Sequence, residues 1–362
     1  MPYRCTPING VDAELARLSG QPPHSACMDG LRSAALCSEG HWLCWDTGRF
    51  EAASAMLPWR GSEERLVSEA DTETGNASAV IAVLAAATAR GSPAPSLGTC
   101  PLFTALLPSV LATAGAGFEY RVYVGYDVGD PFYDNRTNLR AAHAWFGERA
   151  GRLRRERGVR VRLAFLRFLN APGKPGPAFN YVAAAARLDG ADYFFRVNDD
   201  SELLTPWAAP LVAALASFAP PNVGVAGPVC REGNSRILTH DFTHRAHQAV
   251  FGRHYPEDLS DWFMDGWVTA VYPPARTYRH PGVRVRHRLA RRRYAVDGAN
   301  RARLRPRVLE GRAALAAFLA DRCDAHGCRG VRPPPAAALA LRVPVLPPAG
   351  FRQGDMRFST DG

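Results

Sequence analysis

The chain of 362 residues is 47% hydrophobic, enough to bury a large core, which excludes a disordered or fibrous protein. Its formal net charge of +10 is concentrated between residues 276 and 312, where 13 arginines accompany two acidic residues, so the remainder is near neutral. No recognised nucleic-acid-binding module accompanies this charge, so specific nucleic-acid binding is not expected, and the stretch is either a contact for phosphates or a solvated basic face.

Residues 1–75 are expected to form an irregular N-terminal extension, which contains four of the eight cysteines. Cysteines in such a segment, together with glycosylation sequons at Asn76 and Asn135, suggest an oxidising secretory lumen of the Golgi type. No signal peptide opens the chain, and its longest apolar run, residues 77–89, is shorter than the ~20 residues of a membrane span. We therefore expect no membrane span in this chain.

From residue 79 onward, apolar runs typical of strands alternate with patterns typical of helices. The expected strands cover residues 80–84, 120–126, 159–168, 193–197, 222–229 and 283–285. The expected helices cover 102–112, with a kink at Pro108, and 138–155, 180–188, 210–218 and 260–272, the last with Ser260 as N-cap. This alternation predicts an α/β domain over 76–330, with a mostly parallel sheet flanked by helices. A proline-rich tail over 331–362 follows it.

Two adjacent acids, Asp199 and Asp200, follow the most apolar of these strands. In open α/β sheets, ligands bind in the crevice beyond the carboxyl ends of the strands. Carboxylate oxygens there suit a hard divalent cation such as Mg²⁺ or Mn²⁺, which in turn holds substrate phosphates. The alternative is a solvated turn, since Asn-Asp-Asp-Ser is also common turn chemistry.

Several motifs in a fixed order resemble the nucleotide-sugar-dependent glycosyltransferases of the GT-A fold, over roughly residues 78–294. They are the Thr-Ala-Arg-Gly loop at 88–91, the strand ending GYDVGD at 125–130, FFRVNDDSEL at 194–203, FMDGW at 263–267 and VRVRH at 283–287. The resemblance implies a GT-A-like, Rossmann-like α/β fold. It also implies an Asp-x-Asp-type site at which Mn²⁺ or Mg²⁺ bridges the diphosphate of a nucleotide-sugar donor.

In this resemblance the metal ligands are Asp200 and His287, and Asn198 stands where the usual pattern has its first acid. His280 is the second candidate for the histidine, and the alternative for His287 is a surface residue among arginines. An imidazole ligand would favour Mn²⁺. The donor contacts implied by the resemblance are Thr88, Arg90, Asp127, Asp130 and Asp199.

Asp265 resembles the acid that takes the proton from the acceptor hydroxyl in inverting members of the family. Burial among Trp262, Phe263 and Trp267 would raise its pKa and make it a better base. Asp261 is the second candidate, and a helix-capping aspartate is the alternative. The two tryptophans either stack on a sugar or belong to the core. Four histidines lack the spacing of a zinc site: His240, His244, His247 and His254.

Together these features predict a metal-dependent glycosyltransferase with Asp265 as base. It would move a sugar, with inversion, from a nucleotide-diphosphate sugar to a hydroxyl of a glycan, protein or small-molecule acceptor. The alternative is a catalytically inactive protein of the same fold that binds carbohydrate or polyanions through the arginine stretch. The presence of Asp200, Asp265 and His287 in one chain favours the enzyme.

Overall fold

The computed structural model describes residues 79–326 apart from 169, 171–172, 233 and 289–292. The N-terminal extension expected over 1–75, with its cysteines, and the proline-rich tail expected over 331–362 lie outside the described residues. In the described part, Cys100 and Cys230 are free thiols. None of the helices described there combines the length and the apolar character needed to cross a membrane.

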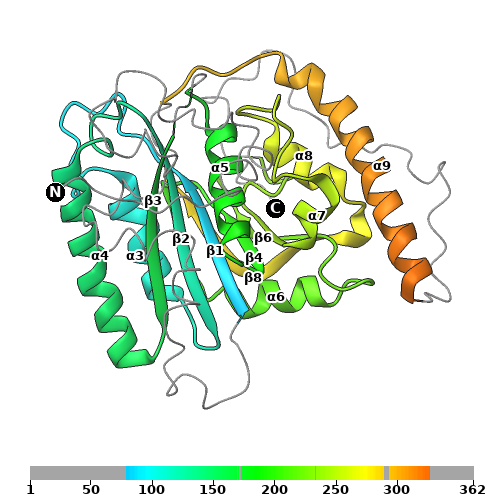
Figure 1. Cartoon of the computed structure of the whole chain (residues 1–362), viewed down its shortest axis with the longest axis horizontal. Coiled ribbons are helices and arrows are strands. Elements are labelled where there is room, and N and C mark those ends of the chain that lie inside the picture. The colour runs from blue at the N-terminus through cyan, green and yellow to red at the C-terminus, as the bar shows by residue number, and fades with distance from the viewer. Residues whose placement is uncertain (1–78, 169, 171–172, 233, 289–292, 327–362) are drawn as a thin grey trace, which may run out of the picture.

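The strands of the described part form one eight-stranded sheet (Figure 1). They are β1 (Ala79–Ala86), β2 (Phe118–Asp127), β3 (Arg160–Phe168), β4 (Tyr193–Arg196), β5 (Ser201–Leu203), β6 (Val225–Cys230), β7 (Asp241–His244) and β8 (Thr277–His287). Their order across the sheet is β3-β2-β1-β4-β7-β6-β8-β5. Strands β3, β2, β1 and β4 are parallel, whereas β7 is antiparallel to its neighbours and β5 to β8. The predicted α/β fold with a mostly parallel sheet is confirmed.

Helices cover both faces of this sheet. They are α3 (Leu107–Thr113), α4 (Arg136–Arg157), α5 (Pro175–Leu188), α6 (Ala208–Ala216), α7 (Ala246–Phe251), α8 (Met264–Val271) and α9 (Asn300–His326). Helices α3 and α4 lie on one face and α5 packs on β1 and β2 from the other (Figure 1). Gly125 of β2 allows this close packing, because a Cβ atom there would lie 2.9 Å from Val182 Cγ1 of α5.

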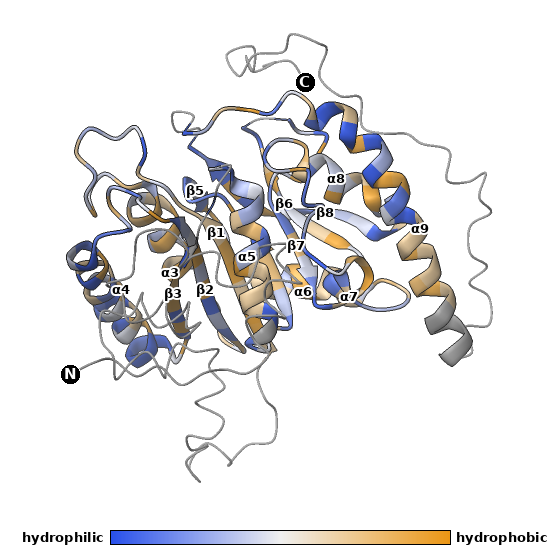
Figure 2. Cartoon of the chain, turned by 45° about the horizontal axis from the view of Figure 1, so that its top comes forward, coloured by the Kyte–Doolittle hydropathy of each residue, from blue (hydrophilic) through white to orange (hydrophobic). Residues whose placement is uncertain are grey.

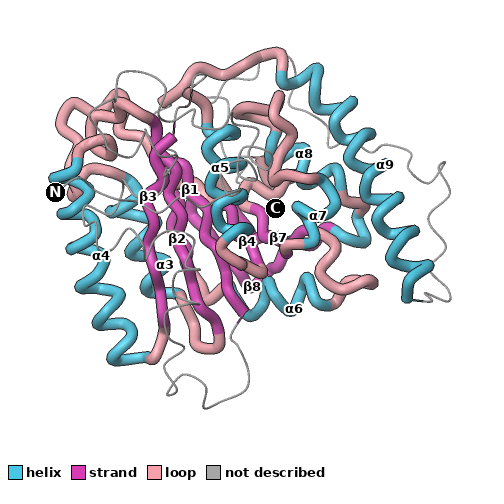
Figure 3. The backbone as a smooth tube through the Cα atoms, viewed as in Figure 1, coloured by secondary structure: helices cyan, strands magenta, loops and turns pink. Residues whose placement is uncertain are grey.

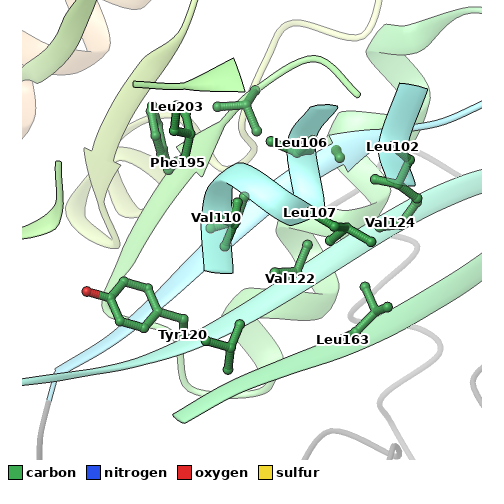
Figure 4. Packing of buried hydrophobic residues seen from close by; sticks show 14 of the residues in the cluster. Leu102, Leu106, Leu107, Val110, Tyr120, Val122, Val124, Leu163, Phe195 and Leu203 are labelled. Carbon is green, nitrogen blue, oxygen red and sulfur yellow. The ribbon is translucent and has the colours of Figure 1, made fainter. Parts of the chain in front are cut away.

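Alternate residues of β1 face opposite sides of the sheet, as the period of a strand requires. Ile81 and Val83 belong to the apolar cluster beneath α3 and α4, and Ala82 and Leu84 to the cluster beneath α5. Figure 4 shows the first cluster, in which residues of α3 lie over β2. The central strands are therefore hydrophobic on both faces, while α4 carries many hydrophilic residues (Figure 2). This double burial explains why β1 is a continuous apolar run in the sequence.

Three helices begin with local structure that the prediction did not include, while α4 and α6 begin two residues earlier than predicted. The helix containing Pro108 is not broken there, because a π-helical turn (Leu102–Leu106) precedes α3 and places the proline in its first turn. Helix α5 begins at Pro175 and not at 180, since a proline suits the first position of a helix. Helix α8 begins at Met264 without a Ser260 cap, after Phe263 in a left-handed conformation (φ 78°).

The arginine stretch is built into the fold. The side chain of Arg276 donates to the carbonyl oxygen of Val223 at 2.9 Å, and Arg307 pairs with Asp258 with its Nε 3.0 Å from a carboxylate oxygen. Much of the stretch forms β8 and the start of α9, where the sequence indicated no helix. Neither a phosphate contact nor a solvated face describes the whole stretch, because several of its arginines bind the protein's own carbonyl and carboxylate groups.

Candidate functional site

The acidic turn between β4 and β5 is buried. Asp199 and Asp200 are 1% and 5% exposed, and the N–H of Ser201 closes the turn on the carbonyl oxygen of Asn198 at 3.1 Å. The turn follows the carboxyl end of β4, and the loops that follow β1 and β2 lie at the same edge of the sheet (Figure 3). It is thus a turn, but not the solvated turn of the alternative interpretation.

Strand pairing brings Asp200 and His287 together. Strand β5 is antiparallel to β8 with Ser201 opposite His287, and Asp200 Oδ1 lies 2.9 Å from His287 Nε2. Asn198 Nδ2 is 3.3 Å from the same ring nitrogen. The backbone N–H of His287 donates to Glu232 Oε2 at 3.2 Å, which fixes the end of β8. Two residues from distant parts of the sequence thus converge beyond the carboxyl end of β4.

The Asp200–His287 pair fits two neighbouring ligands of one divalent ion. Ligands held at ~2.1 Å and at right angles are ~3 Å apart, close to the observed separation. Within the described ranges, no three His, Cys, Asp or Glu side chains are arranged to hold a metal. Asp200 and His287 would supply two ligands, and phosphate oxygens and water would fill further positions, as is common for Mg²⁺. His280 is also in β8, but it lies opposite Pro228 of β6, away from Asp200. Its ring accepts a hydrogen bond from the N–H of Gly282 at 3.1 Å.

Arg293, from the segment after β8, neutralises Asp199. Its Nη1 donates to Asp199 Oδ2 at 2.6 Å, its Nη2 makes a shorter bond to Oδ1, and Nη1 also donates to the carbonyl oxygen of Thr88 at 2.9 Å. Burial raises the pKa of Asp199, and the guanidinium opposes that effect. In this turn Asp199 is therefore paired with Arg293, and Asp200 is the acid that contacts His287.

The loop after β1 is held in place by Asp130. One carboxylate oxygen of Asp130 accepts from Thr88 Oγ1 at 2.8 Å and from the N–H of Ala89 at 2.9 Å. The other accepts from two backbone N–H groups of its own loop, at 2.9 and 3.0 Å. With four donors, Asp130 positions the loop that carries Thr88 and Arg90.

Asp127 and Arg90 form an ion pair at the same edge. Arg90 Nη2 lies 2.6 Å from Asp127 Oδ2, and Asn170 Nδ2 donates to Oδ1 at 2.8 Å. Burial raises the pKa of Asp127, while Asn170 and Arg90 oppose this. The Arg90 side chain is 38% exposed, so its guanidinium lies at the solvent boundary, where a phosphate could reach it.

Asp265 lies in the first turn of α8. Its Oδ1 accepts from the N–H of Gly266 at 2.9 Å, and in the part of the chain that the structure describes no other residue donates a hydrogen bond to this carboxylate. Burial raises the pKa of Asp265, and the cation of Arg196 opposes that effect. A carboxylate with a raised pKa and a second oxygen still able to accept is suited to a general base.

Asp261, the second candidate for the base, is fully occupied. It is 1% exposed and accepts from Lys174 Nζ at 2.8 Å, from the N–H of Asp297 at 2.8 Å and from Asn300 Nδ2 at 2.6 Å. The N–H of Trp262 adds a fourth hydrogen bond at 2.6 Å. Asp261 therefore joins the start of α5 to the start of α9, and Asp265 is the acid with capacity left for a substrate.

The tryptophan and histidine side chains near α8 are mainly core groups. Trp267 is 2% exposed and its Nε1 donates to the carbonyl oxygen of Arg307 at 3.1 Å, which favours the core over sugar stacking. His247 lies 3.0 Å from the hydroxyl of Tyr272 and 2.8 Å from the carbonyl oxygen of His254, and burial lowers its pKa to about 3. His254 lies 3.3 Å from Asp241, so the side chains of His247 and His254 have different partners.

No protein-family model matches the chain, and no curated protein matches it. Among solved structures it is similar to TarS of S. aureus. The crystal structure of TarS 1-349 in complex with UDP matches with a TM-score of 0.39 and 12% identity, over 68% of this chain and 71% of that chain. The complex of TarS 1-349 with UDP-GlcNAc has the same TM-score at 11% identity, over 68% and 72%. A further TarS crystal structure matches at 0.39 and 14%, over 73% and 46%.

Proposed function

We propose that the chain is a metal-dependent glycosyltransferase of the GT-A type, which transfers a sugar from a nucleotide-diphosphate sugar to an acceptor hydroxyl with inversion. The observation that carries this proposal is the 2.9 Å approach of Asp200 to His287 at the carboxyl edge of the parallel strands. These two residues would hold Mn²⁺ or Mg²⁺, which when bound neutralises charge on the diphosphate. Arg90 and Arg293 would add fixed cations beside it.

Asp265 would act as the general base. Its carboxylate accepts the proton of the acceptor hydroxyl while the hydroxyl oxygen forms a bond to the anomeric carbon of the donor. The bond between that carbon and the diphosphate breaks, and its electron pair leaves with the nucleoside diphosphate. Asp265 supports this role better than Asp261, because Asp261 already accepts four hydrogen bonds.

A screen of UDP- and GDP-sugars tests this function without knowledge of the acceptor. With Mn²⁺ present, the protein is expected to hydrolyse at least one donor slowly, and Asp200→Asn should lower the rate. Calorimetry with UDP should show binding with Mn²⁺ or Mg²⁺ present and not in EDTA, because a diphosphate beside the carboxylates is otherwise repelled. Equal UDP affinity in EDTA would contradict the metal assignment.

A second function, binding of carbohydrate polyanions without turnover, is supported by the exposed arginines at the start of α9, including Arg301 and Arg305. It predicts retention on heparin that falls when both residues are replaced by glutamine. Retention of that kind with no hydrolysis of any donor would select this function over the enzyme.

A further inference from the structure

A buried arginine near α8 has one side of its guanidinium group without a partner. Arg196, the last residue of β4, is 4% exposed, and its Nε donates to Asp241 Oδ2 at 2.9 Å and to the hydroxyl of Tyr255 at 2.8 Å. Its Nη1 donates to the carbonyl oxygen of Thr239 at 2.5 Å. Its Nη2 is buried and has no hydrogen-bond partner among the described residues. Burying an unpaired donor is costly, so this guanidinium calls for a function.

One short segment connects this arginine to the proposed base. Thr239 accepts the hydrogen bond from Arg196, and the N–H of the preceding residue, Leu238, donates to Thr269 Oγ1 at 2.9 Å. The Thr269 hydroxyl in turn donates to the carbonyl oxygen of Asp265 at 2.7 Å. The first turn of α8 and the guanidinium are therefore held by the same stretch of backbone.

We propose that Arg196 is a positioning residue for the transfer reaction, whose hydrogen bond to Thr239 helps to fix the first turn of α8 and whose buried cation acts on the Asp265 carboxylate that accepts the acceptor's proton. This inference rests on the proposed function of Asp265 as base. Asp241, from β7, accepts hydrogen bonds from the Arg196 guanidinium and from the hydroxyl of Tyr255 through the same carboxylate oxygen.

The charges that act on Asp265 oppose one another. Burial raises the pKa of Asp265, the Arg196 cation lowers it, and the Asp241 anion raises it. His254, which lies 3.3 Å from Asp241, Tyr255 and the buried His240 are titratable neighbours of this pair. Removing only Arg196 or only Asp241 should therefore move the titration of Asp265 in opposite directions.

Two variants test this by the pH dependence of transfer and by ¹³C NMR titration of the Asp265 carboxyl group, assigned with Asp265→Asn. The double variant Arg196→Gln with Asp241→Asn removes both charges at nearly constant side-chain shape, so that neither charge is left buried without its partner. Because the Arg196 cation has the larger effect on Asp265, the acidic limb of the pH–rate profile should move to higher pH, and the rate at a fixed acidic pH should fall. Asp241→Asn alone should move the limb down.

Arg276→Gln is the matched control. Arg276 is also buried and donates to the carbonyl oxygen of Val223, so its loss should lower stability without moving the Asp265 titration. Shifts that are absent, or in the same direction for both test variants, overturn the inference. No transfer by the wild-type protein would instead overturn the proposed function, and the carboxyl titration would still report whether the Arg196 charge acts on Asp265.

Discussion

Replacing Arg293 by methionine should destabilise the protein, because it leaves the buried Asp199 carboxylate without its cation. The lost hydrogen bond to Thr88 accounts for about 1 kcal/mol. Breaking a fully buried ion pair costs about 3–5 kcal/mol, and the lower part of that range applies because the Arg293 side chain is 19% exposed. We therefore expect a loss of about 3 kcal/mol in the free energy of unfolding at pH 8, measured by urea denaturation.

The size of this loss should depend on pH. Burial already raises the pKa of Asp199, and without the guanidinium the pKa rises further. Between its unfolded and folded pKa values the native state then binds more protons than the unfolded state, so stability falls as pH increases. At pH 5.5 a larger share of Asp199 is protonated, and the destabilisation by Arg293→Met should be smaller than at pH 8.

A double-mutant cycle with Asp199→Asn provides the control for this prediction. The amide needs no cation, so Arg293→Met should cost about 2 kcal/mol less in the Asp199→Asn background. The reasoning is refuted by an equal cost at both pH values together with a coupling energy near zero. That result would mean that the pair contributes nothing beyond the packing of two side chains.

Three further outcomes are expected. Asp265→Asn should reduce kcat by about 10²- to 10⁴-fold with little change in UDP affinity by calorimetry, and it should stabilise the protein at pH 8, since burial penalises the charged form. Asp261→Asn replaces a carboxylate that accepts four hydrogen bonds by an amide that can accept fewer. It should lower the urea midpoint by an amount equivalent to about 2 kcal/mol. Gly311→Ala places a Cβ atom 2.4 Å from Val271 Cγ2, so it should separate α9 from α8 and cost about 1–3 kcal/mol by thermal unfolding.

The parallel half of the sheet could be predicted from the sequence because each strand is a self-contained signal. A run such as β1 is apolar on both faces, and a helix-forming segment follows it. Strand β5 has three residues and pairs with β8, and β7 has four residues and pairs with β4. Strands this short form because of these pairings, so no local sequence pattern predicts them. Helix α9 could not be predicted, because its arginines interrupt the apolar periodicity of a helix and because an internal proline, Pro306, disfavours a helix.

The sequence could predict which residues of the candidate site lie at the ends of strands, but not which side chains they contact. Asp200 follows an apolar strand and His287 ends an alternating one, and both positions can be identified from sequence alone. The partner of Asp199 could not be identified, because Arg293 is 94 residues away and is one of 13 arginines in its stretch. Asp261 and Asp265 are also equivalent in sequence, and only their hydrogen-bond partners distinguish them.

The hydrogen bond from Asn300, at the start of α9, to Asp261 limits how far Arg293 can move. Asn300 is bound there, and the seven residue steps back to Arg293 span at most ~25 Å when fully extended. The guanidinium is thus a tethered ligand, and a short tether gives an effective concentration on the order of mM at its target. A free cation in solution would need a similar concentration to replace Arg293 at Asp199.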